Sequence, residues 1–526
     1  MSERSSMLLR TLPLLASLAA MAPLAPDAAA GDWPMWGRNM NRNMASDEKH
    51  LPDDFAIGGF VPGTDQIDPA GTRNVKWIAK LGSQAYGNPT VANGRVYVGT
   101  NNDTPRDARI QGDRCVLLCL DEASGELLWQ LNVPKLGTGK VSDWEYLGLC
   151  SSAAVEDDRV YVLTNRCEVV CLDVEGMKNG NDGPFEDEGQ YLAGPGKPAM
   201  EVQPTDADII WVLDMIDECG VFPHNITAGS PVIVDDQIWV STSNGVDYGH
   251  VETPAPNAPC LIVVDKRTGE LIAEENSGLS QRLFHSSWVS PSYLRTETED
   301  LGIFGGPDGR CYGFFPDPVE GEDGYMVLKE AWRCDVNKPE YRVKDGEPVK
   351  YPTRYGPSEV LATPVIHGGR VYSLVGQDPE HGEGAGRMVC IDPTKRGDIS
   401  KTGVIWAYDE INRSLSTPSV SEDGLVFVAD LSGFVYCLDA NTGELHWKHD
   451  TFAHIWGSTL LADGKVYVGN EDGILTVLPA TKTLDPEQVK EFDMASPVYS
   501  SPIAANGVLY VATHTHLFAI GSKTDE

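Results

Sequence analysis

The sequence predicts an all-β fold, an eight-bladed β-propeller of four-stranded antiparallel blades whose ring is closed by an N-terminal strand. Three observations predict it. A pattern of short apolar runs separated by Gly, Asp and Asn turns recurs eight times. Its copies begin about 40 to 80 residues apart, which suits propeller blades with insertions. The last copy lacks a fourth strand, and an unmatched fourth strand precedes the first copy.

The clearest copy covers residues 416–447 and defines the four strands of a blade. Apolar residues alternate within each run, and Asp423-Gly424 and Ser432-Gly433 supply the first two turns. The predicted strands of this copy are residues 418–421, 425–429, 434–438 and 445–447. The other seven copies begin near Asn88, Ser151, Gly229, Ser286, Ala362, Gly457 and Ser500.

The two ends of the chain predict how the ring closes. The eighth copy stops after its third strand, at Ile520, while residues 74–77 carry the pattern of a fourth strand with no blade of their own. Pairing these two pieces completes the eighth blade and hides the last unpaired sheet edges. We therefore expect a single domain over residues 31–526.

The first 30 residues predict a signal peptide. Arg4 and Arg10 give a positive start, residues 8–22 are apolar, and Ala28 to Ala30 offer a cleavage site before Gly31. No later stretch approaches the roughly 20 apolar residues that span a bilayer. We expect an exported protein, periplasmic or extracellular, with no transmembrane segment after cleavage.

The charge and the cysteines narrow the possible partners and cross-links. A net charge of −36 repels phosphate backbones, which argues against nucleic acid and anionic lipid surfaces as partners. The eleven cysteines are an odd number. The pairs Cys115/Cys119 and Cys167/Cys171 are too far apart on a strand, roughly 13 Å, to form disulfides within a pair. We interpret them as small buried hydrophobic residues.

Most copies end on a tryptophan, which in two of them follows a turn of the Asp-x-x-Thr/Ser-Gly-Glu type. A large flat side chain at a fixed repeat position is suited to packing between blades. We predict this role for Trp77, Trp129, Trp211, Trp332, Trp406 and Trp447.

Residues 121–129 and 439–447 resemble the tryptophan-docking motif of the pyrroloquinoline-quinone (PQQ) repeat superfamily, and residues 32–38 resemble its N-terminal opening. The resemblance implies the propeller fold but leaves two functions open. One branch oxidises alcohols or sugars with PQQ and calcium at the ring centre. The other, BamB-like branch consists of non-catalytic scaffolds that bind proteins.

Two departures from the dehydrogenase pattern favour the BamB-like branch. The adjacent cysteine pair typical of those enzymes is absent, and there is no Cys-x-x-Cys-His haem motif. We assign no catalytic residue. The first hypothesis is an exported scaffold for an envelope protein or an extracellular polymer. The alternative is a PQQ- and calcium-dependent alcohol or sugar dehydrogenase with a divergent site.

Residues just before the first strand of each blade are expected to face the central tunnel. The candidates are Asn225, His285, Glu359, Trp456 and Tyr499, which would bind a polar ligand or line a water-filled tunnel.

No metal site is assigned from the sequence. Residues 179–188 are rich in oxygen ligands but lack the spacing of a calcium loop, and we interpret them as a solvated insertion. His514 and His516 are two residues apart, so they would face one side of a strand, but no third ligand is evident.

Overall fold

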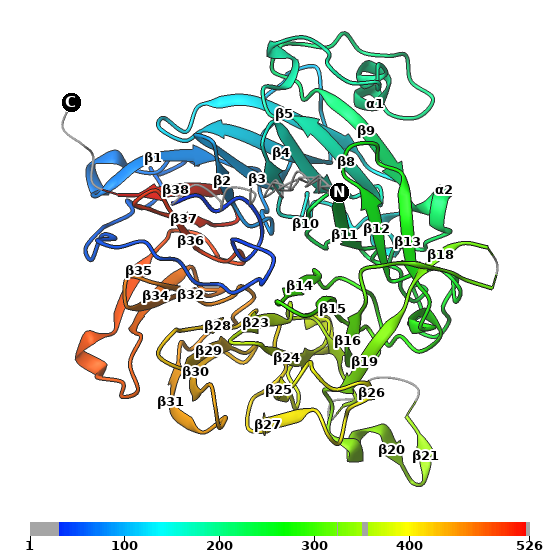
Figure 1. The fold of residues 1–526 in the computed structure, drawn as a ribbon. Coiled ribbons are helices and arrows are strands. Elements are labelled where there is room, and N and C mark those ends of the chain that lie inside the picture. Colours follow the sequence, from blue (N-terminus) through cyan, green and yellow to red (C-terminus); the bar gives the residue numbers. More distant parts are fainter. Residues whose placement is uncertain (1–30, 323, 350–355, 522–526) are drawn as a thin grey trace, which may run out of the picture.

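Eight β-sheets surround a central axis in the computed structural model (Figure 1), which describes residues 31–322, 324–349 and 356–521. The predicted eight-bladed β-propeller is confirmed. The predicted signal peptide lies outside the described residues. No helix within the described ranges is long and apolar enough to cross a membrane.

Each blade is an antiparallel sheet whose strands run in chain order from the axis outwards, except that the outermost strand of the eighth blade is β1. The first four blades comprise β2 (Thr90–Ala92), β3 (Arg95–Asn101), β4 (Arg114–Asp121) and β5 (Leu127–Pro134); β6 (Ala154–Glu156), β7 (Arg159–Leu163), β8 (Glu168–Asp173) and β9 (Ile209–Asp214); β10 (Val232–Val234), β11 (Gln237–Ser241), β12 (Leu261–Asp265) and β13 (Leu271–Glu275); and β14 (Ser292–Arg295), β15 (Asp300–Gly305), β16 (Arg310–Phe314) and β19 (Glu330–Asp335).

The remaining blades follow the same order. They comprise β23 (Val365–His367), β24 (Arg370–Gly376), β25 (Met388–Ile391) and β27 (Val404–Tyr408), with β22 (Glu359–Val360) also paired to β24; β28 (Ser419–Val420), β29 (Leu425–Ala429), β30 (Phe434–Asp439) and β31 (Leu445–Asp450); β32 (Leu460–Ala462), β33 (Lys465–Gly469), β34 (Ile474–Pro479) and β35 (Lys490–Asp493); and β36 (Ile503–Ala505), β37 (Val508–Ala512), β38 (His516–Ile520) and β1 (Val75–Lys80).

Insertions between strands carry the short helices and extra strand pairs. They include α1 (Glu188–Ala193), α2 (Met215–Cys219), β17 (Val319–Glu320), β18 (Met326–Leu328), β20 (Val343–Lys344), β21 (Glu347–Pro348) and β26 (Gly397–Asp398).

The predicted ring closure is also confirmed. Strand β1 pairs antiparallel with β38, from Val75 opposite Ile520 to Lys80 opposite His516. Figure 1 shows the two strands side by side, β1 in blue and β38 in red. The first and the last strand of the chain therefore share one sheet.

The start of the fourth blade differs from the prediction. The sequence placed the start of this copy at Ser286, but its first strand, β14, begins six residues later, at Ser292, whereas the first strands of the other copies begin two or three residues after their predicted starts. Residues 286–289 form a loop instead, because the Trp288 indole donates hydrogen bonds to the carbonyls of His224 and Ile226 (3.2 and 2.9 Å). The stretch Ser286 to Val289 therefore resembles the start of a repeat copy in sequence but lies outside the blade's strands.

Two extra strands cover the outer edges of neighbouring blades. Strand β18 adds in parallel to β13, and β26 adds in parallel to β19. Since an exposed outer strand is a template for pairing with another chain, these insertions protect the rim from edge-to-edge association.

The hydrophobic core lies between adjacent blades, and the predicted tryptophans reach across these interfaces. Five of the six donate an indole hydrogen bond to a backbone carbonyl of the next blade. The pairs are Trp77 to Glu122, Trp129 to Val174, Trp211 to Lys266, Trp406 to Ala440 and Trp447 to Thr481, at 2.8 to 3.2 Å. Trp332 differs: its buried Nε1 has no partner, and its backbone pairs with Gly397 in β26.

The segment of residues 31–46 crosses one end of the ring and contacts all eight blades. In six blades it forms backbone hydrogen bonds, with Val91, Val155, Tyr293, Ile366, Leu461 and Asn506. In the third and sixth blades its side chains donate hydrogen bonds to the carbonyls of Ser230 and Val420. Most of the contacted residues lie in the first strands, and Asn506 lies in the turn between a first and a second strand. We call this end the N-terminal face and the opposite end, with the loops between blades and between second and third strands, the loop face.

Arg42 is the most buried polar anchor of this segment. Its guanidinium is fully buried and donates to the carbonyls of Trp36, Ser230, Pro231 and Pro291 at 2.5 to 3.1 Å. Burial lowers the pKa of Arg42 to about 9. One side chain thus ties the N-terminal segment to two blades.

All eleven cysteines lie within the described residues and none forms a disulfide. Nine are buried, and Cys150 and Cys219 are half-buried. The pairs Cys115/Cys119 and Cys167/Cys171 do not close, in agreement with the prediction.

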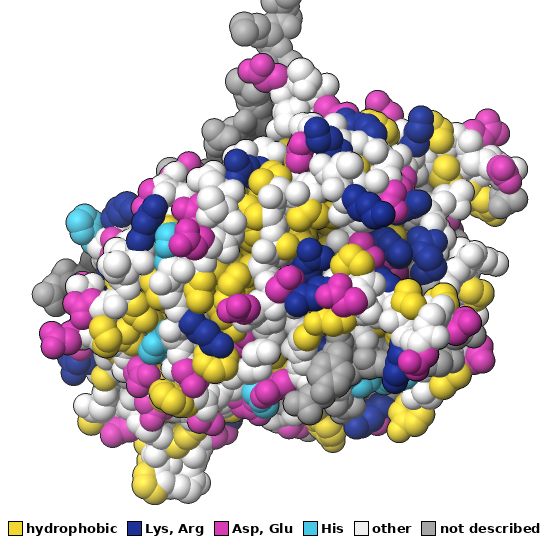
Figure 2. Space-filling model, turned by 90° about the horizontal axis from the view of Figure 1, so that it is seen from below, with side chains coloured by type: hydrophobic (Ala, Val, Ile, Leu, Met, Phe, Trp, Pro, Cys, Tyr) yellow, Lys and Arg dark blue, Asp and Glu magenta, His cyan; other side chains and the backbone are white. Residues whose placement is uncertain are grey.

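The side of the ring shown in Figure 2 carries acidic and basic side chains interspersed with hydrophobic ones. Positive charges there do not merge into a continuous basic surface, which agrees with the net charge of −36.

Candidate functional site

A cavity of about 500 Å³ occupies the centre of the ring. It is lined by the segments that enter the first strand of each blade and, from the N-terminal segment, by Trp36. The Trp36 indole is fixed by a hydrogen bond to Thr363 Oγ1 at 3.1 Å. Because residues 31–46 cross the ring at the N-terminal face, the central tunnel is closed at that end, and Trp36 forms part of the closed end.

Aromatic rings and small polar groups form most of the cavity wall. Trp456 and Tyr499 stack at 4.6 Å with an interplanar angle of 9°, and Tyr86 meets Tyr499 edge-on at 5.4 Å. Trp144 and Trp288 add two more rings. The polar lining includes Asn88, Asn225, Ser458 and Ser501. Such a wall stacks on flat or apolar groups and hydrogen-bonds neutral polar ones.

The five predicted tunnel residues divide into two groups. Asn225, Trp456 and Tyr499 line the cavity. His285 and Glu359 are buried, 1% exposed each, and are not among its lining residues. Both lie beside the cavity wall, because His285 Nε2 is 3.8 Å from the carboxylate of Asp378, which does line it.

The prediction that His514 and His516 face the same side of a strand is wrong. His514 lies in the turn before β38 and packs against Tyr499 at 4.2 Å, whereas His516 begins the strand and packs against Phe60 and Phe518. The turn separates the two imidazoles into different surroundings.

The charge of the cavity wall does not fit PQQ. The quinone carries three carboxylates, which need cationic partners in a site shielded from water. Among the described residues that line the cavity there is no Lys or Arg, and the one charged side chain is the acidic Asp378. An anionic quinone would meet a wall that offers stacking but no counter-charge.

An acidic group that suits a hard cation lies elsewhere. Carboxylate oxygens of Asp173, Asp182 and Asp208 lie within 4.8 Å of one another at the end of β8. Burial raises the pKa of Asp208, and the neighbouring carboxylates of Asp173 and Asp182 add to the effect. None of the three lines the cavity. The cluster therefore does not provide calcium for a quinone at the ring centre.

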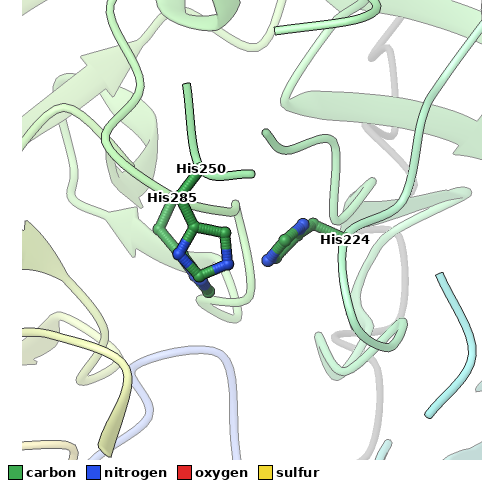
Figure 3. A group of neighbouring side chains, drawn as sticks. All are labelled: His224, His250 and His285. Atoms are coloured by element: carbon green, nitrogen blue, oxygen red, sulfur yellow. The ribbon is translucent and has the colours of Figure 1, made fainter. Parts of the chain in front are cut away.

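A group of histidines lies beside the cavity on the loop face. His224, His250 and His285 each offer a ring nitrogen, and these atoms all lie within 4.8 Å of one another. Their rings face one another (Figure 3), with centroids 4.4 to 4.9 Å apart. The ring of His381 is 5.3 Å from His250 and 5.5 Å from His285. Four imidazoles therefore share one region.

The surroundings keep the imidazoles of His224 and His285 neutral. Burial lowers the pKa of His224 to about 4 and that of His285 well below its ordinary value, and the neighbouring histidines lower both further. Burial, followed by the nearby Asp378, raises the pKa of Glu359. Neutral imidazoles beside carboxyl groups favour ligand binding over ion pairing.

Sequence reasoning singled out His285 but not His224 or His250. The three residues lie in separate loops without a shared motif, so their convergence is a property of the ring. The available signal was weak: one histidine precedes the third blade, one lies in the insertion within it, and one follows it.

Comparison with known proteins defines the class. A family model described as outer membrane protein assembly factor BamB matches residues 69–178 and 384–485. BamB from Moraxella catarrhalis superposes with a TM-score of 0.50 at 12% identity, over 86% of this chain and 98% of that one. A search of curated proteins found no significant match.

Two solved oxidoreductases share the architecture as well. The quinohemoprotein alcohol dehydrogenase ADHIIG from Pseudomonas putida HK5 gives a TM-score of 0.55 at 13% identity, over 94% of this chain and 81% of that one. A europium-containing methanol dehydrogenase gives a TM-score of 0.53 at 13% identity, over 93% of this chain and 91% of that one. The protein is thus a closed eight-bladed β-propeller. More particularly, two parts of the chain match the BamB model, and its fold resembles the PQQ-like β-propellers of BamB and of quinoprotein dehydrogenases.

Proposed function

We propose that the protein is an exported, non-catalytic scaffold that binds an envelope protein on its loop face. The observation that carries the proposal is the central cavity, which is aromatic, opens among the loops between blades, and lacks the cationic lining that a carboxylated quinone requires. The partial match to the BamB model supports the same function.

Exposed apolar side chains on the loop face support a protein partner. Phe452 is 85% exposed, Tyr248 67%, Val251 57% and Tyr146 46%. All four lie in loops between blades or between second and third strands. Exposed apolar groups around a concave site are typical of protein-binding surfaces.

Export is supported by the N-terminal sequence. Its charged start, apolar stretch and small-residue cleavage site have the order of a signal peptide. We propose that the mature chain begins at Gly31, whose carbonyl accepts a hydrogen bond from Asn506 in the eighth blade.

Site-specific photo-crosslinking in intact cells tests the scaffold. A photoreactive amino acid at position 452 should give a discrete adduct with a partner, and Phe452→Ser should weaken co-purification of that partner. Position 325 is the matched control, because Tyr325 is also exposed (68%) but lies in the β17–β18 insertion towards the N-terminal face. Equal adducts at both positions, or an adduct at 325 alone, would contradict binding by the loop face. A polysaccharide partner would appear as binding to envelope glycans without a protein adduct.

A quinone titration tests the alternative. The purified protein should lack a quinone absorbance band, and PQQ with calcium should leave its tryptophan fluorescence unchanged, although Trp144, Trp288 and Trp456 line the cavity. Saturable quenching together with dye-linked oxidation of an alcohol or a sugar would establish a dehydrogenase instead.

A further inference from the structure

Three imidazoles from three separate loops meet beside the central cavity. His224 precedes β10, His250 lies between β11 and β12, and His285 precedes β14. We infer that His224, His250 and His285 bind one divalent transition-metal ion of the zinc class. This site is independent of whether the protein acts as a scaffold.

The backbone holds two of the three ligands in place without a metal. Residues 243–246 run between the segments that carry His224 and His285. His224 N donates to Ser243 O at 3.2 Å, and Val246 N donates to His285 O at 2.9 Å. A Cβ atom on Gly245 would lie 2.5 Å from His224 Cβ and 2.7 Å from the His285 carbonyl. The close approach of these two ligands therefore depends on a glycine between them.

The third ligand is carried on a turn with its own hydrogen bonds. His250 N donates to Asp247 O at 3.0 Å, and the Asp247 carboxylate accepts from the amides of Val251 and Glu252 at 2.9 and 3.1 Å. His250 is half-buried, so an ion can reach the site from the loop face.

The ring nitrogens that face the cluster have lone pairs to offer. His224 Nδ1 lies 2.7 Å from Val246 O, and since a carbonyl only accepts, Nδ1 carries the proton and Nε2 is left as a ligand atom. His224 Nε2 is buried and has no hydrogen-bond partner. The same is true of His285 Nδ1, and the whole His285 side chain is 1% exposed. A bound ion would satisfy these otherwise costly polar atoms.

The donor set selects the metal. Neutral imidazoles suit Zn²⁺, Co²⁺, Ni²⁺ and Cu²⁺, whereas Ca²⁺ and Mg²⁺ require oxygen ligands. Tetrahedral zinc with bonds of about 2.0–2.1 Å places its ligand nitrogens about 3.4 Å apart. The three nitrogens, within 4.8 Å of one another, reach that spacing through small side-chain rotations.

Nearby groups can complete the coordination. The Asp378 carboxylate lies 3.8 Å from His285 Nε2, and the His381 ring is 5.3 Å from that of His250. Asp378 also lines the cavity, so the histidine cluster adjoins the cavity wall.

Metal binding is tested on the full-length protein after treatment with a chelator. We expect one equivalent of Zn²⁺ per chain in a competition titration, a rise in melting temperature with Zn²⁺, and visible absorption bands of four-coordinate Co²⁺. Ca²⁺ and Mg²⁺ should cause no such rise. His250→Ala removes the half-buried ligand and should weaken zinc binding at least about tenfold.

His367→Ala is the matched control, because His367 is also half-buried but lies at the end of β23, away from the cluster. It should bind zinc like the parent protein. Circular dichroism verifies that both variants are folded. The inference is overturned if neither Zn²⁺ nor Co²⁺ binds. It is equally overturned if His250→Ala and His367→Ala bind zinc alike, since other donors, such as the cysteine thiols, would then hold the ion.

Discussion

The ring of Trp77 packs directly against Gly125, so that a Cβ atom on Gly125 would lie 2.6 Å from two of its carbon atoms. Trp77 belongs to β1, the strand that closes the ring, and Gly125 belongs to the first blade. This contact, together with the hydrogen bond from the Trp77 indole to Glu122 O, joins the last blade to the first. The same tryptophan–glycine pairing recurs for Trp211 with Gly269 and for Trp406 with Gly443.

The variant Gly125→Ala should destabilise the protein more than Gly94→Ala. Both glycines have a φ of +73°, so alanine meets the same backbone strain of about 1–2 kcal/mol at each. Gly94 has open space around it, whereas Gly125 faces Trp77, which adds about 1–3 kcal/mol of overpacking. Urea unfolding measures both. Equal losses for the two variants would show that the blade contact contributes nothing.

Much of the fold was predictable because its information is local. Turn residues and alternating apolar positions specify each hairpin, and the strands β29 and β30 begin where residues 425 and 434 were predicted. Closure was predictable because the two unmatched ends complement each other. The fourth blade was misplaced because Trp288 bonds to a neighbouring loop instead of entering a strand.

The candidate sites were predictable only in part, because they depend on the arrangement of the ring. Asn225, Trp456 and Tyr499 reach the cavity, but whether a residue before a first strand faces the axis depends on the path of its loop. The histidine cluster joins loops from three places in the sequence, and no local pattern marks it.

The variant Arg42→Met should be strongly destabilising. It leaves the buried carbonyls of Trp36, Ser230, Pro231 and Pro291 without their donor, at a cost of about 3 kcal/mol or more. Arg38→Met, in the same segment, breaks only the pair with the exposed Asp47 and should cost less than about 1 kcal/mol. Thermal unfolding compares them. A loss at Arg42 no larger than at Arg38 would mean that the segment adds little to the ring.

His516 should make the eighth blade sensitive to acid. Burial, and then the charge of Lys80, lower the pKa of His516 to about 4, against 6.5 in an unfolded chain. Its contribution to stability is therefore complete above about pH 6.5 and is lost as the pH falls towards 4. Between pH 7 and pH 5 the free energy of unfolding of the His516→Gln variant should therefore fall by about 1–2 kcal/mol less than that of the parent protein.

The control for this prediction is His50→Asn, which changes an exposed histidine. Denaturant unfolding at several pH values gives the stability curves. If the His516→Gln and parent curves run parallel below pH 6.5, the imidazole is not the group that responds.

The cysteines should all be free thiols. A thiol reagent should count eleven in the denatured protein without prior reduction, and a reductant should leave the melting temperature unchanged. In the native protein only Cys150 and Cys219 are partly accessible, and burial raises the pKa of each to about 12, so both should react slowly. A count below eleven before reduction would reveal a disulfide.

The crossing of residues 31–46 beneath every blade has a consequence for the order of events during synthesis. The segment of residues 31–46 has no complete set of partners until the eighth blade exists, and that blade needs β38, which ends at Ile520. The nascent molecule is therefore an open arc for most of its synthesis. The central cavity is closed at one end by Trp36 of residues 31–46, and its lining is complete only when the eighth blade has formed. A ligand of this cavity can therefore be held only by a finished chain.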